Sequence, residues 1–296
     1  MRKLMGLSIL AVVLAVVCLA SCAYSQETMI WNGTDLAAAG ITLGTWGSGT
    51  ATVENKDKKR LLEGNQSIKI TSDGQYMGAR LDFAQPISLA ETAIDPAKYL
   101  VLTIFFPESD FVGPSNATYN PYDIVPYRVP KVEKLRVMLI SDTGVKVPIM
   151  CPTNPLDLED NWVRVAIPMA KLVIPQDQTA FKLARLVIAS STKATFWLSQ
   201  IRLVTDNNPI KVDGLSSQVV AVGDYLYFQA NVRAGVSPVL CSWNFGDGTV
   251  VAAGPKTRIV GHPFNKGGDF TISLTVTDAL GVKTPVTVSN TISVSE

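Results

Sequence analysis

From residue 27 to residue 206 the chain alternates short apolar and polar runs, separated by Gly, Pro, Asn and Asp, without a long stretch of helical period. A period of two is typical of strands that bury one face. The pattern predicts strands at 67–71, 78–83, 99–106, 134–141, 146–151, 162–168, 183–190 and 194–204. Eight such strands favour an all-β fold, a two-sheet jelly-roll β-sandwich.

The alternation continues towards the C-terminus, where Ile272, Leu274 and Val276 are separated by Thr and Ser. Such a strand has one core face and one solvated face. Between the two regions the polar segment 206–209 ends in a proline, which blocks strand continuation. We therefore expect two domains, at 22–206 and 207–296.

A compact motif, W-N-F-G-D-G-T, lies between Cys241 and Thr249. Trp243 and Phe245 are two positions apart and point to one face of a strand, where large rings fill the space between two sheets. The two glycines of the motif allow positive φ in a turn, and Asp247 is placed to accept hydrogen bonds from neighbouring amides. Every residue of the motif is explained by folding, so it indicates a fold and no reaction.

This motif and the downstream run G-D-F-T-I-S-L-T-V-T-D resemble the PKD family across residues 208–296. The resemblance implies an Ig-like β-sandwich that serves extracellular proteins as a spacer, an adhesion unit or a polysaccharide contact. It implies structural roles for Trp243, Phe245, Gly246, Asp247, Gly248, Phe264 and Phe270.

The strand pattern of residues 60–205 resembles the galactose-binding-like jelly rolls found among carbohydrate-binding modules. Such domains commonly carry an Asp in the last strand, where this chain has Ser199 or Gln200. The fold class that both resemblances imply is a jelly-roll β-sandwich followed by an Ig-like (PKD) β-sandwich.

The first 21 residues read as a signal peptide, with Arg2 and Lys3 before the apolar run 4–19. This run is shorter than the roughly 20 residues that span a bilayer. Residues 19–22, L-A-S-C, resemble a bacterial lipobox, which implies lipidation of Cys22 and a lipid anchor in the outer membrane or at the cell surface. Cleavage after Ser25 is the alternative, and it would release a soluble secreted protein.

Charge and cysteines exclude some partners. The chain has 26 basic and 25 acidic residues and a net charge of +1, so no basic surplus points to nucleic acid. Outside the leader region, Cys151 and Cys241 fall in different predicted domains, either as buried thiols or as an interdomain disulfide. With a single histidine, His262, no metal-ligand spacing appears, and no cofactor is expected.

Catalytic motifs are not found in the sequence. A Ser-His-Asp triad would have to use His262, which stands beside a proline, and neither a G-x-S-x-G turn nor an H-E-x-x-H pattern occurs. Asp157, Glu159 and Asp160 form an acidic run, which is either a solvated turn or a weak candidate for calcium binding. We expect no catalytic residue and no enzyme activity.

A long segment at 107–134 contains five prolines and four aromatic residues. Long loops inside compact domains are often functional, and aromatic rings stack on sugars while polar groups bind hydroxyls. The candidate ligand-binding residues are Phe111, Tyr119, Tyr122, Asp123 and Tyr127. Alternatively, these rings pack against the sandwich.

Together these features predict an exported cell-envelope lipoprotein that binds polysaccharide or a surface protein without catalysis. A structural subunit of a surface layer, sheath or filament is the first alternative. A carboxylate-based glycoside hydrolase, or its accessory subunit, is the second.

Overall fold

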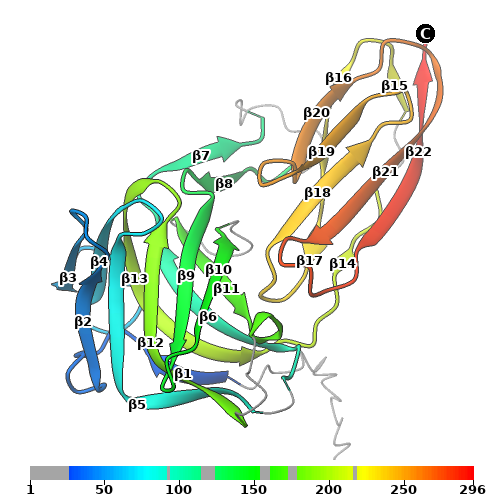
Figure 1. Ribbon diagram of the computed structural model, residues 1–296. Helices are drawn as coiled ribbons and strands as arrows, with labels where there is room; N and C mark the ends of the chain where they lie inside the picture. The colour runs from blue at the N-terminus through cyan, green and yellow to red at the C-terminus, as the bar shows by residue number, and fades with distance from the viewer. Residues whose placement is uncertain (1–26, 92–93, 115–123, 154–160, 173–178, 216–218) are drawn as a thin grey trace, which may run out of the picture.

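The computed structural model describes residues 27–91, 94–114, 124–153, 161–172, 179–215 and 219–296, which form two β-sandwiches (Figure 1). Within these ranges no helix is long and apolar enough to cross a membrane. The predicted signal peptide and several candidate residues lie outside the described residues: Cys22, Tyr119, Tyr122, Asp123, Asp157, Glu159 and Asp160.

The first sandwich consists of two antiparallel sheets. Sheet A has the order β11 (Trp162–Pro168), β6 (Lys98–Phe105), β13 (Lys193–Thr205), β4 (Ser67–Asp73) and β3 (Thr52–Asp57), and β1 (Glu27–Trp31) also pairs with β13. Sheet B has the order β10 (Lys146–Pro152), β9 (Lys134–Ser141), β12 (Ala180–Ser190), β5 (Gly78–Glu91) and β2 (Ile41–Trp46). A 3-10 turn, η1 (Met169–Lys171), follows β11.

All eight predicted strands are present and the jelly-roll sandwich is confirmed, but its described residues form eleven strands where the sequence predicted eight. The three additional strands are β1, β2 and β3. The edge strand β3 reads T-V-E-N-K-D and is mostly exposed, so it lacks the apolar face that marks a strand in sequence. β5 runs to Glu91, well beyond its predicted end, through two irregularities in its pairing with β12.

The core of the first sandwich lies between its two sheets. Leu81, Leu139 and Leu186 from sheet B face Ile70 and Leu102 from sheet A, and all five are fully buried. Burying a side chain of this size stabilises the fold by about 1.5–3 kcal/mol. Alternating strand positions supply these residues, as the period of two predicts.

The second sandwich has one five-stranded sheet and a second layer of two strand pairs. The sheet order is β15 (Val219–Ala221), β22 (Val286–Ser295), β21 (Gly268–Asp278), β18 (Val239–Asn244) and β19 (Val250–Gly254), in which β15 runs parallel to β22. The opposite layer holds β16 (Tyr225–Gln229) with β20 (Ile259–Pro263), and β14 (Lys211–Val212) with β17 (Val232–Arg233). This is the expected Ig-like architecture.

Aromatic rings fill the core of the second sandwich. Trp243 is 1% exposed and stacks parallel to Phe245, with ring centroids 6.2 Å apart. Its indole nitrogen donates a hydrogen bond to the Thr257 carbonyl at 2.8 Å. Phe264 is buried and stacks against Phe270 at 5.0 Å. These rings stand between the two layers, where the motif predicted them.

The turn of the motif is fixed by its glycines and by Asp247. Gly246 has φ +76°, and a Cβ there would lie 2.6 Å from the Thr271 carbonyl oxygen, so no other residue fits. Gly248 has φ +99°. Asp247 accepts a hydrogen bond from the Thr249 amide at 2.9 Å, and its other oxygen lies 2.9 Å from His262 Nε2. Burial acts to raise the pKa of Asp247, but these hydrogen bonds outweigh it and hold the pKa below its usual value.

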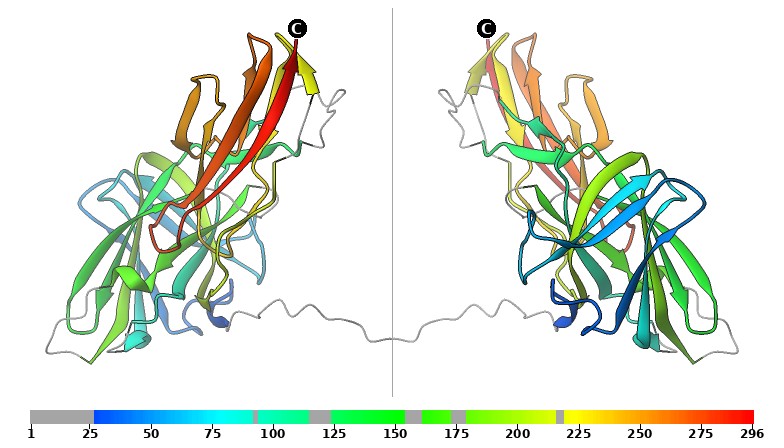
Figure 2. Two further views of the ribbon diagram at one scale, coloured as in Figure 1. Left: turned by 90° about the vertical axis from the view of Figure 1, so that its right-hand side faces the viewer. Right: turned by 90° about the vertical axis from the view of Figure 1, so that its left-hand side faces the viewer.

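The two sandwiches meet through an apolar contact on the outer face of sheet A. Tyr99 and Val101 of β6 pack against Leu280 and Val282, which follow β21. The Tyr99 hydroxyl lies 3.3 Å from Ser237 Oγ. Figure 2 shows the second sandwich standing against the first, with the C-terminus at the end farthest from it.

Asp206 fastens the connecting segment. It is 4% exposed and accepts hydrogen bonds from Lys283 Nζ at 2.7 Å, from the Val236 amide at 2.8 Å and from the Asn208 amide at 3.0 Å. Gly235, with φ +60°, leaves the space that the carboxylate occupies, because a Cβ there would lie 2.0 Å from it. The domain boundary at residue 206 stays a prediction. The Asp206 carboxylate accepts its hydrogen bonds from residues of the second sandwich, although the sequence analysis assigned it to the first domain.

Cys151 and Cys241 are separate buried thiols. Burial raises the pKa of Cys151 to about 12 and that of Cys241 to about 11. Because the thiolate is the reactive species, we expect iodoacetamide at pH 8 to leave both thiols of the native chain unmodified and to label both in guanidinium. Peptide mapping by mass spectrometry measures this, with Thr192→Cys as an exposed control that labels at once. Rapid native labelling of either cysteine would contradict the burial.

Candidate functional site

The segment that was predicted to bind ligand begins and ends in a two-stranded ribbon, β7 (Ser109–Val112) with β8 (Tyr127–Pro130). In this ribbon Phe111 pairs with Arg128. Directly paired residues of antiparallel strands lie on one face, so the two side chains are neighbours. The Phe111 ring is 52% exposed, which suits a ring that stacks on a ligand.

Tyr127 has a different environment, because the ribbon reaches the second sandwich (Figure 1). The Tyr127 hydroxyl donates to the Pro255 carbonyl at 3.3 Å and accepts from the Arg258 amide at 3.2 Å. Burial raises the pKa of Tyr127 to about 12. Lys256 adds an ion pair of 2.6 Å with Asp110. The Tyr127 side chain is therefore held against the second sandwich, and a role for it in ligand binding stays a prediction.

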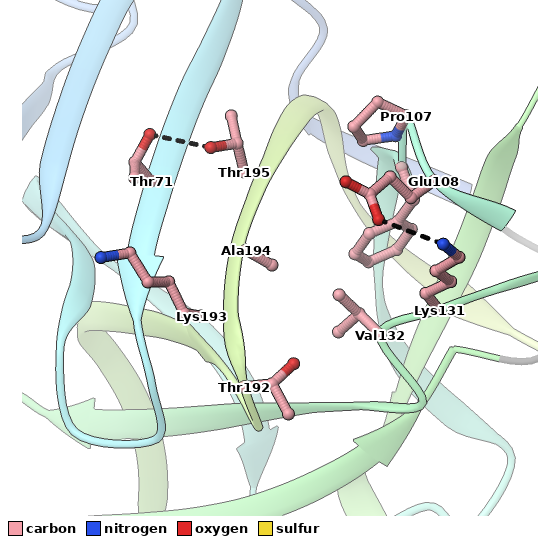
Figure 3. A pocket seen from close by; sticks show the side chains of 10 residues that line it. Thr71, Pro107, Glu108, Lys131, Val132, Thr192, Lys193, Ala194 and Thr195 are labelled. Carbon is pink, nitrogen blue, oxygen red and sulfur yellow. Dashed lines mark hydrogen bonds and ion pairs between the residues drawn. The ribbon is translucent and has the colours of Figure 1, made fainter.

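A hollow of about 430 Å³ lies on one side of the ribbon's base, where the two sheets of the first sandwich open. Figure 3 shows Thr71 and Thr195 on one wall, joined by a hydrogen bond of 3.1 Å, and Glu108 and Lys131 on the other. The Lys131 ammonium lies 3.6 Å from the Glu108 carboxylate. The polar groups that line this hollow are therefore mostly paired with one another.

A second hollow, of about 650 Å³, lies on the other side of the ribbon's base, and we call it the basic hollow. Its lining residues come from four segments of the first sandwich: Lys59, Arg60, Leu61, Phe105, Arg128, Asn161 and Trp162. Phe105 and Trp162 form an edge-to-face pair with centroids 5.4 Å apart, and they are only 7% and 6% exposed. The charged ends of the lining residues therefore dominate its surface.

Two arginines of the basic hollow are held in place. The Arg60 guanidinium carbon lies 4.8 Å from the centroid of the Phe105 ring, a cation–π contact. Arg128 Nη1 donates to Ser109 Oγ at 3.3 Å, and that hydroxyl donates to Asn161 Oδ1 at 3.0 Å. The amide nitrogen of Asn161 is then the end left to donate to a ligand. The arrangement offers positioned hydrogen-bond donors and positive charge.

The sequence did not reveal the basic hollow. Lys59 and Arg60 belong to the run K-D-K-K-R, which is typical of a solvated surface, and Arg128 lies far away along the chain. The segment after β3 carries Lys59 and Arg60, the β11–β6 pairing places Trp162 beside Phe105, and the β7–β8 ribbon carries Arg128, so the hollow forms only in the folded chain. Among the described residues no group of three His, Cys, Asp or Glu side chains is placed to hold a metal ion.

Comparison with solved structures finds partial similarities, of which three illustrate the range. The enzymatically active domain of bacteriophage CBA120 tailspike protein 4 is 10% identical, with 55% of this chain and 19% of that chain covered and a TM-score of 0.30. A structure of promiscuous carbohydrate-binding modules from the β-sandwich superfamily is 14% identical, with coverages of 59% and 60% and a TM-score of 0.32. A Clostridium thermocellum endo-1,4-β-D-xylanase 10B fragment complexed with xylohexaose is 13% identical, with coverages of 61% and 30% and a TM-score of 0.30.

The present chain spans less than two thirds of the length of each of these structures, and similarities of this size say nothing of ligand or activity. Comparison with curated protein sequences gives no match.

The family model described as PKD domain matches residues 210–290. The matched range contains the buried Trp243 and Phe245, the glycine turn and the five-stranded sheet described above. The sequence-based resemblance is thereby confirmed, and the second sandwich of this chain is a PKD domain.

Proposed function

We propose that this chain is a non-catalytic cell-envelope protein that binds polysaccharide through its first sandwich, next to the β7–β8 ribbon. The observation that carries the proposal is the Phe111–Arg128 pair: an exposed ring lies beside a positioned arginine of the basic hollow. Saccharide sites combine an aromatic surface for the apolar face of a sugar with donors for its oxygens. Phe111 and Arg128 supply one of each.

The PKD domain contacts the elements that form the site and so helps to hold them in place. It bonds the ribbon through Tyr127 and Lys256, and it packs on sheet A through Leu280. A site whose elements are already ordered loses less conformational entropy when a ligand binds. In this proposal the PKD domain has a positioning role, and an envelope location with the lipid anchor at Cys22 accords with such a role.

A glycan array followed by calorimetry on the purified chain tests the proposal. Replacing Phe111 by Ala should weaken binding of the selected glycan roughly tenfold, because an aromatic hot spot is worth more than about 1 kcal/mol. The matched control is Tyr76→Ala, since Tyr76 is also an exposed ring, 65% accessible, and lies against Arg136 of sheet B. An array without any hit, or equal losses in both variants, would contradict the proposal.

The oligomeric state separates this proposal from a structural subunit of a sheath, layer or filament. A polysaccharide-binding module needs no copies of itself, so we expect a single species of monomer mass in size-exclusion chromatography with light scattering, up to high protein concentration. Concentration-dependent growth into large assemblies, with no glycan bound, would favour the structural role.

A further inference from the structure

The basic hollow contains three cations and no acid among its described lining residues. Lys59, Arg60 and Arg128 form no ion pair with any described carboxylate, whereas Lys69, Lys131 and Lys256 each have a carboxylate partner. Cations that converge in a concave site repel one another and focus the field on its centre. An anion in the hollow would relieve this repulsion.

The donors in the hollow suit an oxyanion. A guanidinium presents planar, paired N–H groups that match a carboxylate or sulfate in two hydrogen bonds. Arg60 lies over the Phe105 ring, and Arg128 is oriented through Ser109, so less side-chain freedom is lost when they bind. The Asn161 amide nitrogen adds an uncharged donor on the same side.

The floor of the hollow disfavours a neutral sugar or a nucleobase as its occupant. A nucleobase stacks on an exposed aromatic face and the apolar face of a sugar packs on one, yet Phe105 and Trp162 are only 7% and 6% exposed. The exposed ring is Phe111, beside Arg128 on the ribbon. A ligand with one sugar ring on Phe111 and one negative group in the basic hollow would use both the exposed ring and the unpaired cations.

We propose that the basic hollow binds the negatively charged group of an acidic saccharide, a carboxylate or a sulfate. This inference rests on the proposed function, and it adds the class of ligand. The polysaccharide lies with a ring on Phe111 and its oxyanion between Arg60 and Arg128. Lys59 contributes charge at the rim.

Calorimetry on the full chain tests this with four probes: an oligogalacturonide, a sulfated chondroitin oligosaccharide, a neutral xylo-oligosaccharide and a single-stranded oligonucleotide. We expect one of the two acidic saccharides to bind at least about tenfold more tightly than the neutral one, and to weaken with added salt. Comparing the affinities of the oligogalacturonide and the sulfated chondroitin oligosaccharide shows whether a carboxylate or a sulfate is preferred.

The decisive variant is Lys59→Gln/Arg60→Gln/Arg128→Gln, which should lower the affinity for the acidic saccharide roughly a hundredfold or more. The neutral probe should lose far less affinity, because the glutamine amides keep hydrogen-bond donors for sugar oxygens and only the charge is removed. The control is Lys146→Gln/Lys182→Gln/Lys211→Gln, which removes the same charge from exposed positions elsewhere. The control should bind like the parent chain. Unchanged melting temperatures exclude a folding defect.

Four results would overturn the inference. If both triple variants lose equal affinity, net charge alone is responsible. If the oligonucleotide binds as tightly as the acidic saccharide, the hollow takes any polyanion. If the neutral probe binds best and the triple variant binds every probe like the parent chain, the protein binds polysaccharide but does not prefer acidic saccharides. If no saccharide binds at all, the proposed function and this inference are both wrong.

Discussion

Replacing Trp243 by Ala should destabilise the PKD domain by about 3–5 kcal/mol, the usual loss for a large aromatic removed from a core. The side chain is 1% exposed, stacks on Phe245 and donates to the Thr257 carbonyl, so the change leaves a cavity and an unpaired acceptor. Domains are typically stable by only about 5–15 kcal/mol, which makes this loss a large fraction of the total. Urea unfolding followed by far-UV circular dichroism measures it.

The control for this substitution is Tyr225→Ala in the same domain. Its ring is 60% exposed, so its removal should change the free energy of unfolding by about 0.5 kcal/mol or less. A Trp243→Ala midpoint no lower than that of the control would contradict the structural role of the motif.

Replacing Lys283 by Met should cost about 3 kcal/mol, because it leaves the Asp206 carboxylate buried without its ammonium partner. The two side chains are 8% and 2% exposed. Arg233→Met is the matched control, since its ion pair with Asp213 has side chains 73% and 51% exposed. A pair of that kind contributes about 0–1 kcal/mol. Equal losses in the two variants, measured by urea unfolding, would show that burial adds nothing to the pair.

The same pair predicts a response to acid. Burial acts to raise the pKa of Asp206, yet the Lys283 ammonium and two backbone amides outweigh it, so the pKa lies below its usual value. A carboxyl whose folded pKa is depressed contributes stability above its unfolded pKa, and this contribution is lost as the pH falls through the folded value. Lys283→Met removes one of the lowering causes, so its acid-unfolding midpoint should shift to higher pH. An unchanged midpoint in a circular-dichroism titration would contradict this.

Sequence periodicity predicts those strands in which one face is buried. β9 and β11 were predicted at their observed bounds because their apolar positions alternate or run together. β2 and β3 were missed, because Gly44 interrupts the first and exposed polar residues fill the second. Trp46 of β2 is half-exposed on the outer face of sheet B, whereas Trp31 of β1 is a core residue.

The candidate site is harder to predict than the strands. Phe111 was predicted as a candidate because an aromatic residue in a long proline-containing segment is a local signal, and its exposure is seen only in the structure. The docking of Tyr127 on the PKD domain, and the meeting of Arg60 with Arg128, depend on pairings between distant segments. A single sequence contains no period or spacing that encodes such contacts.

The ribbon gives the molecule a second mechanical connection between its halves. In the proposed function, a polymer bound to the first sandwich would pull on the molecule, and a single flexible linker would let the two halves swing apart. Here tension would be shared by the covalent connection at residues 206–209 and by the contacts of Asp110 and Tyr127 with the loop before β20. The hollow would therefore keep its shape under load until the ribbon is peeled from the PKD domain.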